Sequence, residues 1–158
     1  MPIGLRPSSF DHGDQIARFA AQGLLTGAPE PAARPRAPAW DDPSTGDVPE
    51  RARAYLDANC GYCHHATGAA RTSGLSLRRE ERDPLALGIC KRPVAAGRGA
   101  GDLAFDIVPG KPDESIAVHR MRSTEPQVMM PEIGRSLAHD EAVALVSEWI
   151  ARLPGDCP

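Results

Sequence analysis

The sequence, 158 residues long, predicts a mostly α-helical domain with a loop-rich middle. A capping box, with Asp47 as the N-cap and Glu50 three residues later, marks the start of one helix. Residues 140–153 predict a second helix, because their apolar side chains recur at helical spacing. These side chains are Val143, Val146, Trp149, Ile150 and Leu153. Residues 66–104 are rich in glycine and arginine and carry only a weak apolar signal, so we expect loops there.

The chain ahead of the capping box divides into two segments. Residues 14–25 have apolar side chains at helical spacing, and a helix this short needs a surface to cover. Residues 27–45 contain prolines spaced among alanines and arginines, a composition typical of an extended linker. We therefore interpret residues 1–26 as a short helical segment at the tail of an upstream domain, residues 27–45 as a proline-rich linker, and residues 46–158 as the domain proper.

The helix that starts at the capping box leads to Cys60-Gly61-Tyr62-Cys63-His64, which spells C-x-x-C-H. This motif is the signature of covalent haem c attachment. Two thiols at this spacing can each add across a vinyl group of one haem, and the histidine that follows can bind the iron. The sequence thus predicts Cys60 and Cys63 as thioether donors and His64 as the proximal iron ligand. Since the motif occurs once, we expect one haem c.

Two other kinds of site can use the same letters. A structural zinc site needs four ligands, and His65 is the only additional one nearby. A redox-active dithiol would be favoured by a βαβ pattern around the motif, and none is visible. The composition adds support for haem, because a chain with three Phe, two Trp and two Tyr has few large side chains to fill a core, and a porphyrin would help to fill it.

Three segments are predicted between the motif and the last helix. Phe105 to Val108 forms a short extended piece that Pro109-Gly110 ends. A helix begins near Asp113 and continues to about Ser123, and a loop covers residues 124–136. The last helix then begins at about Asp140, where an acidic first turn suits the positive end of the helix dipole.

The sixth position of a haem iron can be open, or it can be closed by methionine or histidine. Met130, beside Pro131 in the loop before the last helix, is the predicted distal ligand, and Met129 is the alternative. Adjacent residues of an extended loop point in opposite directions, so we expect only one of them to reach the iron. Met121 lies at helical spacing with its neighbours and is interpreted as part of the core, and His119 is a weaker candidate for the ligand.

Cys90 and Cys157 are left over by the haem interpretation. In an oxidising compartment they are candidates for a disulfide, although connectivity cannot be deduced from sequence and two free thiols are the alternative. Haem c is attached outside the cytoplasm, so we expect a periplasmic or secreted protein. The sequence has no secretion signal at its start and no membrane-spanning run. We therefore expect it to be a mature form, a piece of a longer chain, or a sequence whose start is misplaced.

These features together resemble class I c-type cytochromes, over roughly residues 47–153. The resemblance rests on a helix that ends in the C-x-x-C-H motif, a late Met130-Pro131 loop and an amphipathic C-terminal helix. It implies a cytochrome c-like fold, with the N- and C-terminal helices packed around a covalently bound haem. Residues 108–115 and 129–134 are more particularly similar to the C-terminal haem domain of larger, mostly uncharacterised secreted bacterial proteins.

The predicted function is one-electron transfer in the periplasm by a haem with His64 and Met130 as axial ligands. Such a protein is an electron carrier rather than a catalyst, and its partner is a redox protein or an upstream domain. The alternative is a module of a larger oxidoreductase that relays electrons or turns over a small ligand at an open iron. The net charge of −3, without a basic and aromatic patch, gives no indication of nucleic-acid binding.

Overall fold

The computed structural model describes Ser8 and residues 14–158. The chain forms two compact units, Met1–Pro38 and Ala39–Pro158. Within the described residues, regular structure consists of four α-helices and several short 3-10 turns, and no β-strand is formed beyond isolated bridges. The predicted mostly helical, loop-rich fold is therefore confirmed. None of these helices is long and apolar enough to cross a membrane.

The first unit contains helix α2, Gln15–Ala21, in the described part of its chain. The sequence predicted a longer helix, to residue 25. It ends earlier because Gly23 adopts a left-handed backbone with φ 70, which no α-helix contains. Leu24 consequently lies on the surface, 72% exposed. Pro31–Ala33 forms a 3-10 turn within the proline-rich segment.

The second unit begins at Ala39, earlier than the predicted domain boundary at residue 46. Trp40 accounts for the difference, because its side chain packs against the hydrophobic core. Its carbonyl also accepts a hydrogen bond from the Arg51 guanidinium at 2.8 Å, and its indole meets His139 edge-on at 4.5 Å between ring centroids. Part of the predicted linker is thus folded onto the domain.

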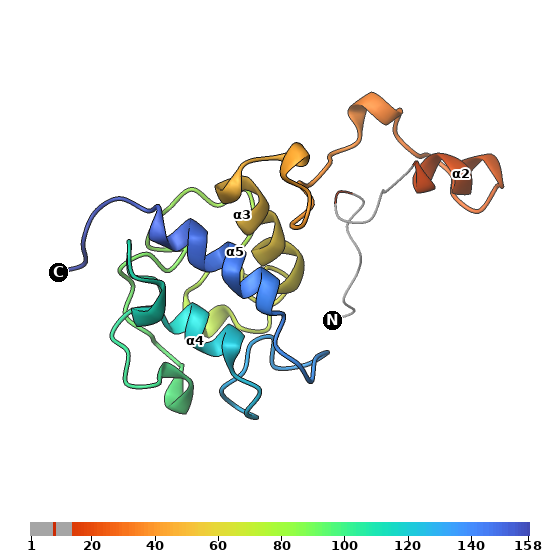
Figure 1. Cartoon of the computed structure of the whole chain (residues 1–158). Coiled ribbons are helices and arrows are strands. Elements are labelled where there is room, and N and C mark those ends of the chain that lie inside the picture. The colour runs from red at the N-terminus through yellow and green to blue at the C-terminus, as the bar shows by residue number, and fades with distance from the viewer. Residues whose placement is uncertain (1–7, 9–13) are drawn as a thin grey trace. The chain divides into compact units, whose positions relative to one another are not determined.

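Helices α3, Val48–Asn59, and α5, Asp140–Ala151, pack against each other and form most of the core (Figure 1). The capping box of α3 is present as predicted. The Asp47 carboxylate accepts from the Glu50 amide at 2.9 Å, and the Glu50 carboxylate accepts from the Asp47 amide at 3.0 Å. The core of this unit is made of these buried residues: Val48, Ala52, Leu56, Ile107, Val118, Met121, Val143, Leu145, Val146, Trp149 and Ile150.

Helix α4, Ile116–Arg122, starts later than predicted. Pro112–Glu114 forms a 3-10 turn instead of a first helical turn. The break lies at Ser115, whose buried hydroxyl accepts from the Val108 amide at 2.9 Å and donates to the Lys111 carbonyl at 3.0 Å. These bonds hold Ser115 in an extended conformation, with φ −99 and ψ 123, which the α-helix cannot include.

Two isolated β-bridges and a disulfide connect the loop-rich middle to the rest of the second unit. Isolated parallel bridges join Ile89 to Ile107 and Phe105 to Ser115, so the predicted extended piece from Phe105 to Val108 pairs with its neighbours. Cys90 and Cys157 form a disulfide between the middle of the unit and its C-terminal tail. The pairing that the sequence left open is thus present.

Candidate functional site

The C-x-x-C-H motif forms a turn directly after α3. The Cys60 amide donates to the Leu56 carbonyl at 2.8 Å as the last bond of the helix, and the His64 amide donates to the Cys60 carbonyl at 2.9 Å. Gly61 fits closely against the helix end, because a Cβ there would lie 2.8 Å from the Asp57 carbonyl oxygen. The turn therefore presents both cysteines and His64 at the end of a well-packed helix.

His64 is oriented by Ser73. Its Nδ1 lies 3.0 Å from the Ser73 hydroxyl, which donates its single proton to the Ala70 carbonyl at 2.7 Å and accepts from the Leu75 amide at 3.2 Å. Since the serine proton is already used, the imidazole must donate from Nδ1. The hydrogen-bond network thus places the lone pair of the neutral ring on Nε2, which is the arrangement a metal-ligating histidine needs.

The protonation state of His64 agrees with this role. Burial lowers the pKa of the imidazole, and the nearby positive charge of Arg120 lowers it further. The ring is therefore neutral at pH 7. A neutral imidazole is the form that binds a metal.

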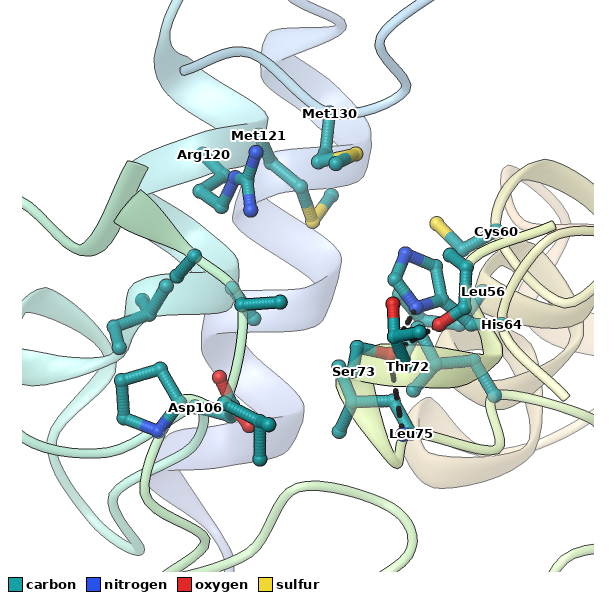
Figure 2. Close-up of a pocket in the computed structure, with 18 residues that line it drawn as sticks. Leu56, Cys60, His64, Thr72, Ser73, Leu75, Asp106, Arg120, Met121 and Met130 are labelled. Atoms are coloured by element: carbon teal, nitrogen blue, oxygen red, sulfur yellow. Dashed lines mark hydrogen bonds between the residues drawn. The ribbon is translucent and has the colours of Figure 1, made fainter. Parts of the chain in front are cut away.

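An open cavity with a volume of about 160 Å³ lies beside this imidazole. Two stretches of chain supply most of its lining: residues 60–77, here named the His64 wall, and residues 88–137, here named the Met130 wall. Figure 2 shows His64 projecting from one side toward Met121 and Met130 on the other. Most of the lining is apolar and includes Leu56, Ala70, Leu75, Leu77, Pro93, Val94, Ala95, Ala96, Ile116 and Ala117.

The two motif cysteines differ in their position. Both are partly buried, but Cys60 lines the cavity and Cys63 does not. Burial raises the pKa of the Cys60 thiol to about 12, with a further contribution from Cys63. Cys60 is therefore a neutral thiol at pH 7, unlike the thiolate with lowered pKa that redox-active dithiols use.

Of the four predicted haem-binding residues, Cys60, Cys63, His64 and Met130, the cavity brings together all but Cys63. Met129 is half-buried and is not part of the lining. Met121, which the sequence assigned to the core, is buried at 7% exposure and also lines the cavity. His119 lies instead against Gly101, where a Cβ would be 2.5 Å from its Nε2. Two thioethers, Met121 and Met130, thus face His64.

Two charged side chains also line the cavity, Asp106 and Arg120. Asp106 pairs with Lys91 at 3.2 Å, and both side chains are only 11% exposed. Burial raises the pKa of Asp106, and the attraction of Lys91 offsets this effect in part. The Arg120 guanidinium donates from Nε to the Val128 carbonyl at 2.8 Å. Both charged side chains of the lining therefore form hydrogen bonds within the protein.

Sequence reasoning missed Ser73 and Gly68, which shape the His64 wall. Gly68 allows the chain to turn back over the motif, since a Cβ there would lie 2.1 Å from the Cys63 carbonyl oxygen. The Ala70 amide then donates to that carbonyl at 3.1 Å. The glycine-rich and serine-containing composition after the motif indicates a turn, but it does not say which hydroxyl meets the histidine.

The described residues contain no cluster of three or more His, Cys, Asp or Glu side chains placed to hold a metal ion. The donors around the cavity are instead one imidazole, one thiol and two thioethers, which suit a haem whose own nitrogens supply four of the ligands to iron. Comparisons with protein-family models, with curated proteins and with solved structures found no match.

Proposed function

We propose that residues 39–158 form a monohaem c-type cytochrome domain that transfers one electron at a time. One observation carries this proposal: the C-x-x-C-H turn opens onto an apolar cavity into which His64 projects, with Met130 facing it. Cys60 and Cys63 would hold the porphyrin as thioethers, and His64 and Met130 would be its axial ligands. When bound, haem supplies reversible one-electron chemistry between two oxidation states of iron.

The residues of the chain have defined parts in such a site. Ser73 holds the imidazole so that Nε2 is available. The apolar lining would surround a bound haem with an environment of low polarity, which would favour the less charged, reduced state and raise the reduction potential. A thioether ligand acts in the same direction. The site therefore suits electron transfer more than turnover of a substrate.

The competing interpretations of the motif receive less support. A zinc site would need about four ligands close together, and the described residues offer no such cluster. A reactive dithiol would need a thiolate, whereas the pKa of Cys60 is raised to about 12 by burial. Haem attachment needs neither condition, and it also gives a use to the cavity.

The disulfide supports a location outside the cytoplasm. Disulfides such as Cys90–Cys157 persist in oxidising compartments and are rare in the cytosol of mesophiles. A periplasmic or secreted location is consistent with covalent haem attachment and is part of this proposal. Its redox partner would be another protein or another part of a longer chain.

The test is to express the full chain with a haem c maturation system and to record absorption spectra of both oxidation states. We expect haem that stays attached under denaturing conditions, and a weak far-red band in the oxidised form that reports iron–methionine ligation. Met130→Ala should abolish that band. Met129→Ala is the matched control, since the neighbouring methionine does not line the cavity, and it should keep the band.

The outcomes separate the candidate functions. Wild-type protein without covalent haem would contradict the proposal and return attention to zinc or dithiol chemistry. Covalent haem without the far-red band would indicate an open iron and favour turnover of a small ligand. A band that survives Met130→Ala but not Met121→Leu would assign the ligand to α4, because Leu preserves the core volume of Met.

A further inference from the structure

Arg120 forms hydrogen bonds to the Met130-containing loop through both its backbone and its side chain. Its carbonyl accepts a hydrogen bond from the Met130 amide at 2.9 Å. Its side chain donates from Nε to the Val128 carbonyl at 2.8 Å, and from Nη2 to the Gln127 carbonyl at 3.4 Å. Gly99 closes the space beside the guanidinium, because a Cβ there would lie 2.8 Å from Cζ. The backbone of Arg120 therefore holds the loop at Met130, and its side chain holds the loop at Gln127 and Val128.

Arg135 reaches back from the same loop to the end of α4. Its Nη2 donates to the carbonyls of Arg120 at 3.1 Å and of Ser123 at 2.6 Å. Its Nε donates to the Pro131 carbonyl at 3.3 Å and its Nη1 to the Leu137 carbonyl at 3.1 Å. One guanidinium thus joins two carbonyls at the C-terminal end of α4 to two carbonyls of the loop.

Before Met130 the loop is also anchored by Val128, which is 6% exposed. Ile133 is 61% exposed and Leu137 is 76% exposed, so apolar burial contributes little after Met130. The last carbonyls of a helix lack partners within the helix and are good acceptors. Hydrogen bonds from a charged guanidinium to them are about twice as strong as bonds between neutral groups. The position of the loop after Met130 therefore depends mainly on Arg135, while Arg120 holds the part before it.

We propose that Arg120 and Arg135 are positioning residues that hold the Met130 thioether toward the cavity, an inference that rests on the proposed haem site. The two arginines act on the methionine through the backbone of its loop and do not touch the iron. Lysine cannot substitute fully at residue 135, because one ammonium cannot reach carbonyls that the planar guanidinium reaches with three nitrogens. Without Arg135 the loop can move away, and an added ligand can then compete for the iron.

The experiment compares the oxidised full chain, loaded with covalent haem, as wild type, Arg135→Gln, Arg135→Lys and Arg122→Gln. Arg122 is the matched control, because it ends the same helix and pairs with Asp113 at 2.6 Å, away from the loop. The readouts are the far-red band and the Kd for added imidazole. We expect Arg135→Gln to weaken the band and to bind imidazole about tenfold more tightly. Arg135→Lys should recover part of the difference, and Arg122→Gln should match wild type.

Met121 requires one further comparison, since its thioether also lines the cavity and could replace Met130. Met121→Leu is the reference protein for this comparison, because it removes the second thioether, and the Arg135→Gln/Met121→Leu protein should lose the band that Met121→Leu shows. A double variant with the full band and an unchanged imidazole Kd would overturn the positioning role while leaving the haem proposal intact. Wild-type protein without covalent haem would instead overturn the proposed function itself.

Exchange of the Met130 amide hydrogen gives a second measurement if Arg135→Gln fails to fold. This amide is the group that donates to the Arg120 carbonyl. The inference predicts faster exchange of this amide in Arg135→Lys than in wild type, with unchanged rates for the amides of α3. Equal rates for Met130 in the two proteins would contradict it.

Discussion

The two walls of the cavity differ in the sequence separation of the residues whose hydrogen bonds and disulfide hold them in place. On the His64 wall these interactions are local: His64 bonds Ser73 across nine residues, and the Leu77 amide donates to the His64 carbonyl at 2.9 Å. The Met130 wall also contains connections between residues farther apart in the sequence. Arg135 bonds the Arg120 carbonyl across 15 residues, and the Cys90–Cys157 disulfide spans 67.

This difference indicates how each wall responds to change. A turn built from local bonds directly after α3 loses little chain entropy when it forms, because its ends are already close. A wall that depends on distant partners needs the rest of the unit to be folded first. We therefore expect the Met130 wall to be the part of the site that opens first when the unit is destabilised.

Removing the disulfide should have the largest effect. Replacing Cys90 and Cys157 by serine frees a loop with a sequence separation of 67 residues, and chain entropy then predicts a loss of about 4 kcal/mol in the free energy of unfolding. Denaturant unfolding of wild type and the double variant measures this difference. Hydrogen exchange at low denaturant should rise first on the Met130 wall.

Two results would count against that expectation. A change in unfolding free energy below about 1 kcal/mol would mean that the tail contributes little to the stability of the unit. Faster exchange at residues 60–77 ahead of residues 88–137 would reverse the order proposed for the two walls.

The difference between local interactions and interactions of residues distant in sequence also explains which features the sequence could predict. The capping box of Asp47 and Glu50 and the apolar face of α5 are local patterns, and both helices begin where these patterns placed them, although α5 ends at Ala151 rather than at residue 153. The start of α4 was placed too early, because the buried hydroxyl of Ser115 bonds to Val108 and Lys111 in a way that no periodicity encodes. Local sequence patterns therefore predicted the helices, but they did not show that hydrogen bonds of the folded chain delay the start of α4.

The candidate site shows a similar limit. The five-residue C-x-x-C-H motif was enough to identify Cys60, Cys63 and His64 as candidates, because covalent haem attachment requires this spacing. Arg135 could not be found in this way, since its partners are backbone carbonyls, which any residue supplies. Trp40 was assigned to a linker, although it meets His139, which is distant in sequence. The side chains that position the site are bound to partners that leave no pattern in the sequence.

Ser73→Ala tests the His64 wall and should have a smaller effect. It leaves the Nδ1 proton of His64 without an acceptor, which costs about 1–3 kcal/mol in unfolding free energy. In the haem-loaded protein the less basic imidazole stabilises oxidised iron less, so the reduction potential should rise. A redox titration of the variant beside wild type measures this shift.

Ser147→Ala is the matched control for that substitution. The Ser147 hydroxyl is buried on α5 without a hydrogen-bond partner in the described part of the chain, so its removal should leave the potential unchanged. Ser73→Thr keeps a hydroxyl and should restore the wild-type potential. If Ser73→Ala also leaves the potential unchanged, Ser73 does not set the basicity of His64.

Asp106, on the Met130 wall, should give the smallest effect, seen as a pH dependence. Burial raises the pKa of this carboxyl above its ordinary value of 3.8, and the Lys91 charge lowers it only in part. The folded state therefore holds the proton more tightly than the unfolded state. The resulting stability is fully present below pH 3.8 and is lost as the pH rises through the raised pKa of Asp106.

Asp106→Asn isolates this contribution, because the amide oxygen can still accept from Lys91 Nζ, 3.2 Å from the carboxylate in wild type, while it cannot titrate. Wild type should lose stability relative to the variant as the pH is raised from about 3.5 toward 7. Unfolding free energies of both proteins across that range measure the difference. A difference that stays constant with pH would mean that Lys91 fully compensates for the burial of Asp106, so that this part of the Met130 wall accepts the ionised carboxylate without loss.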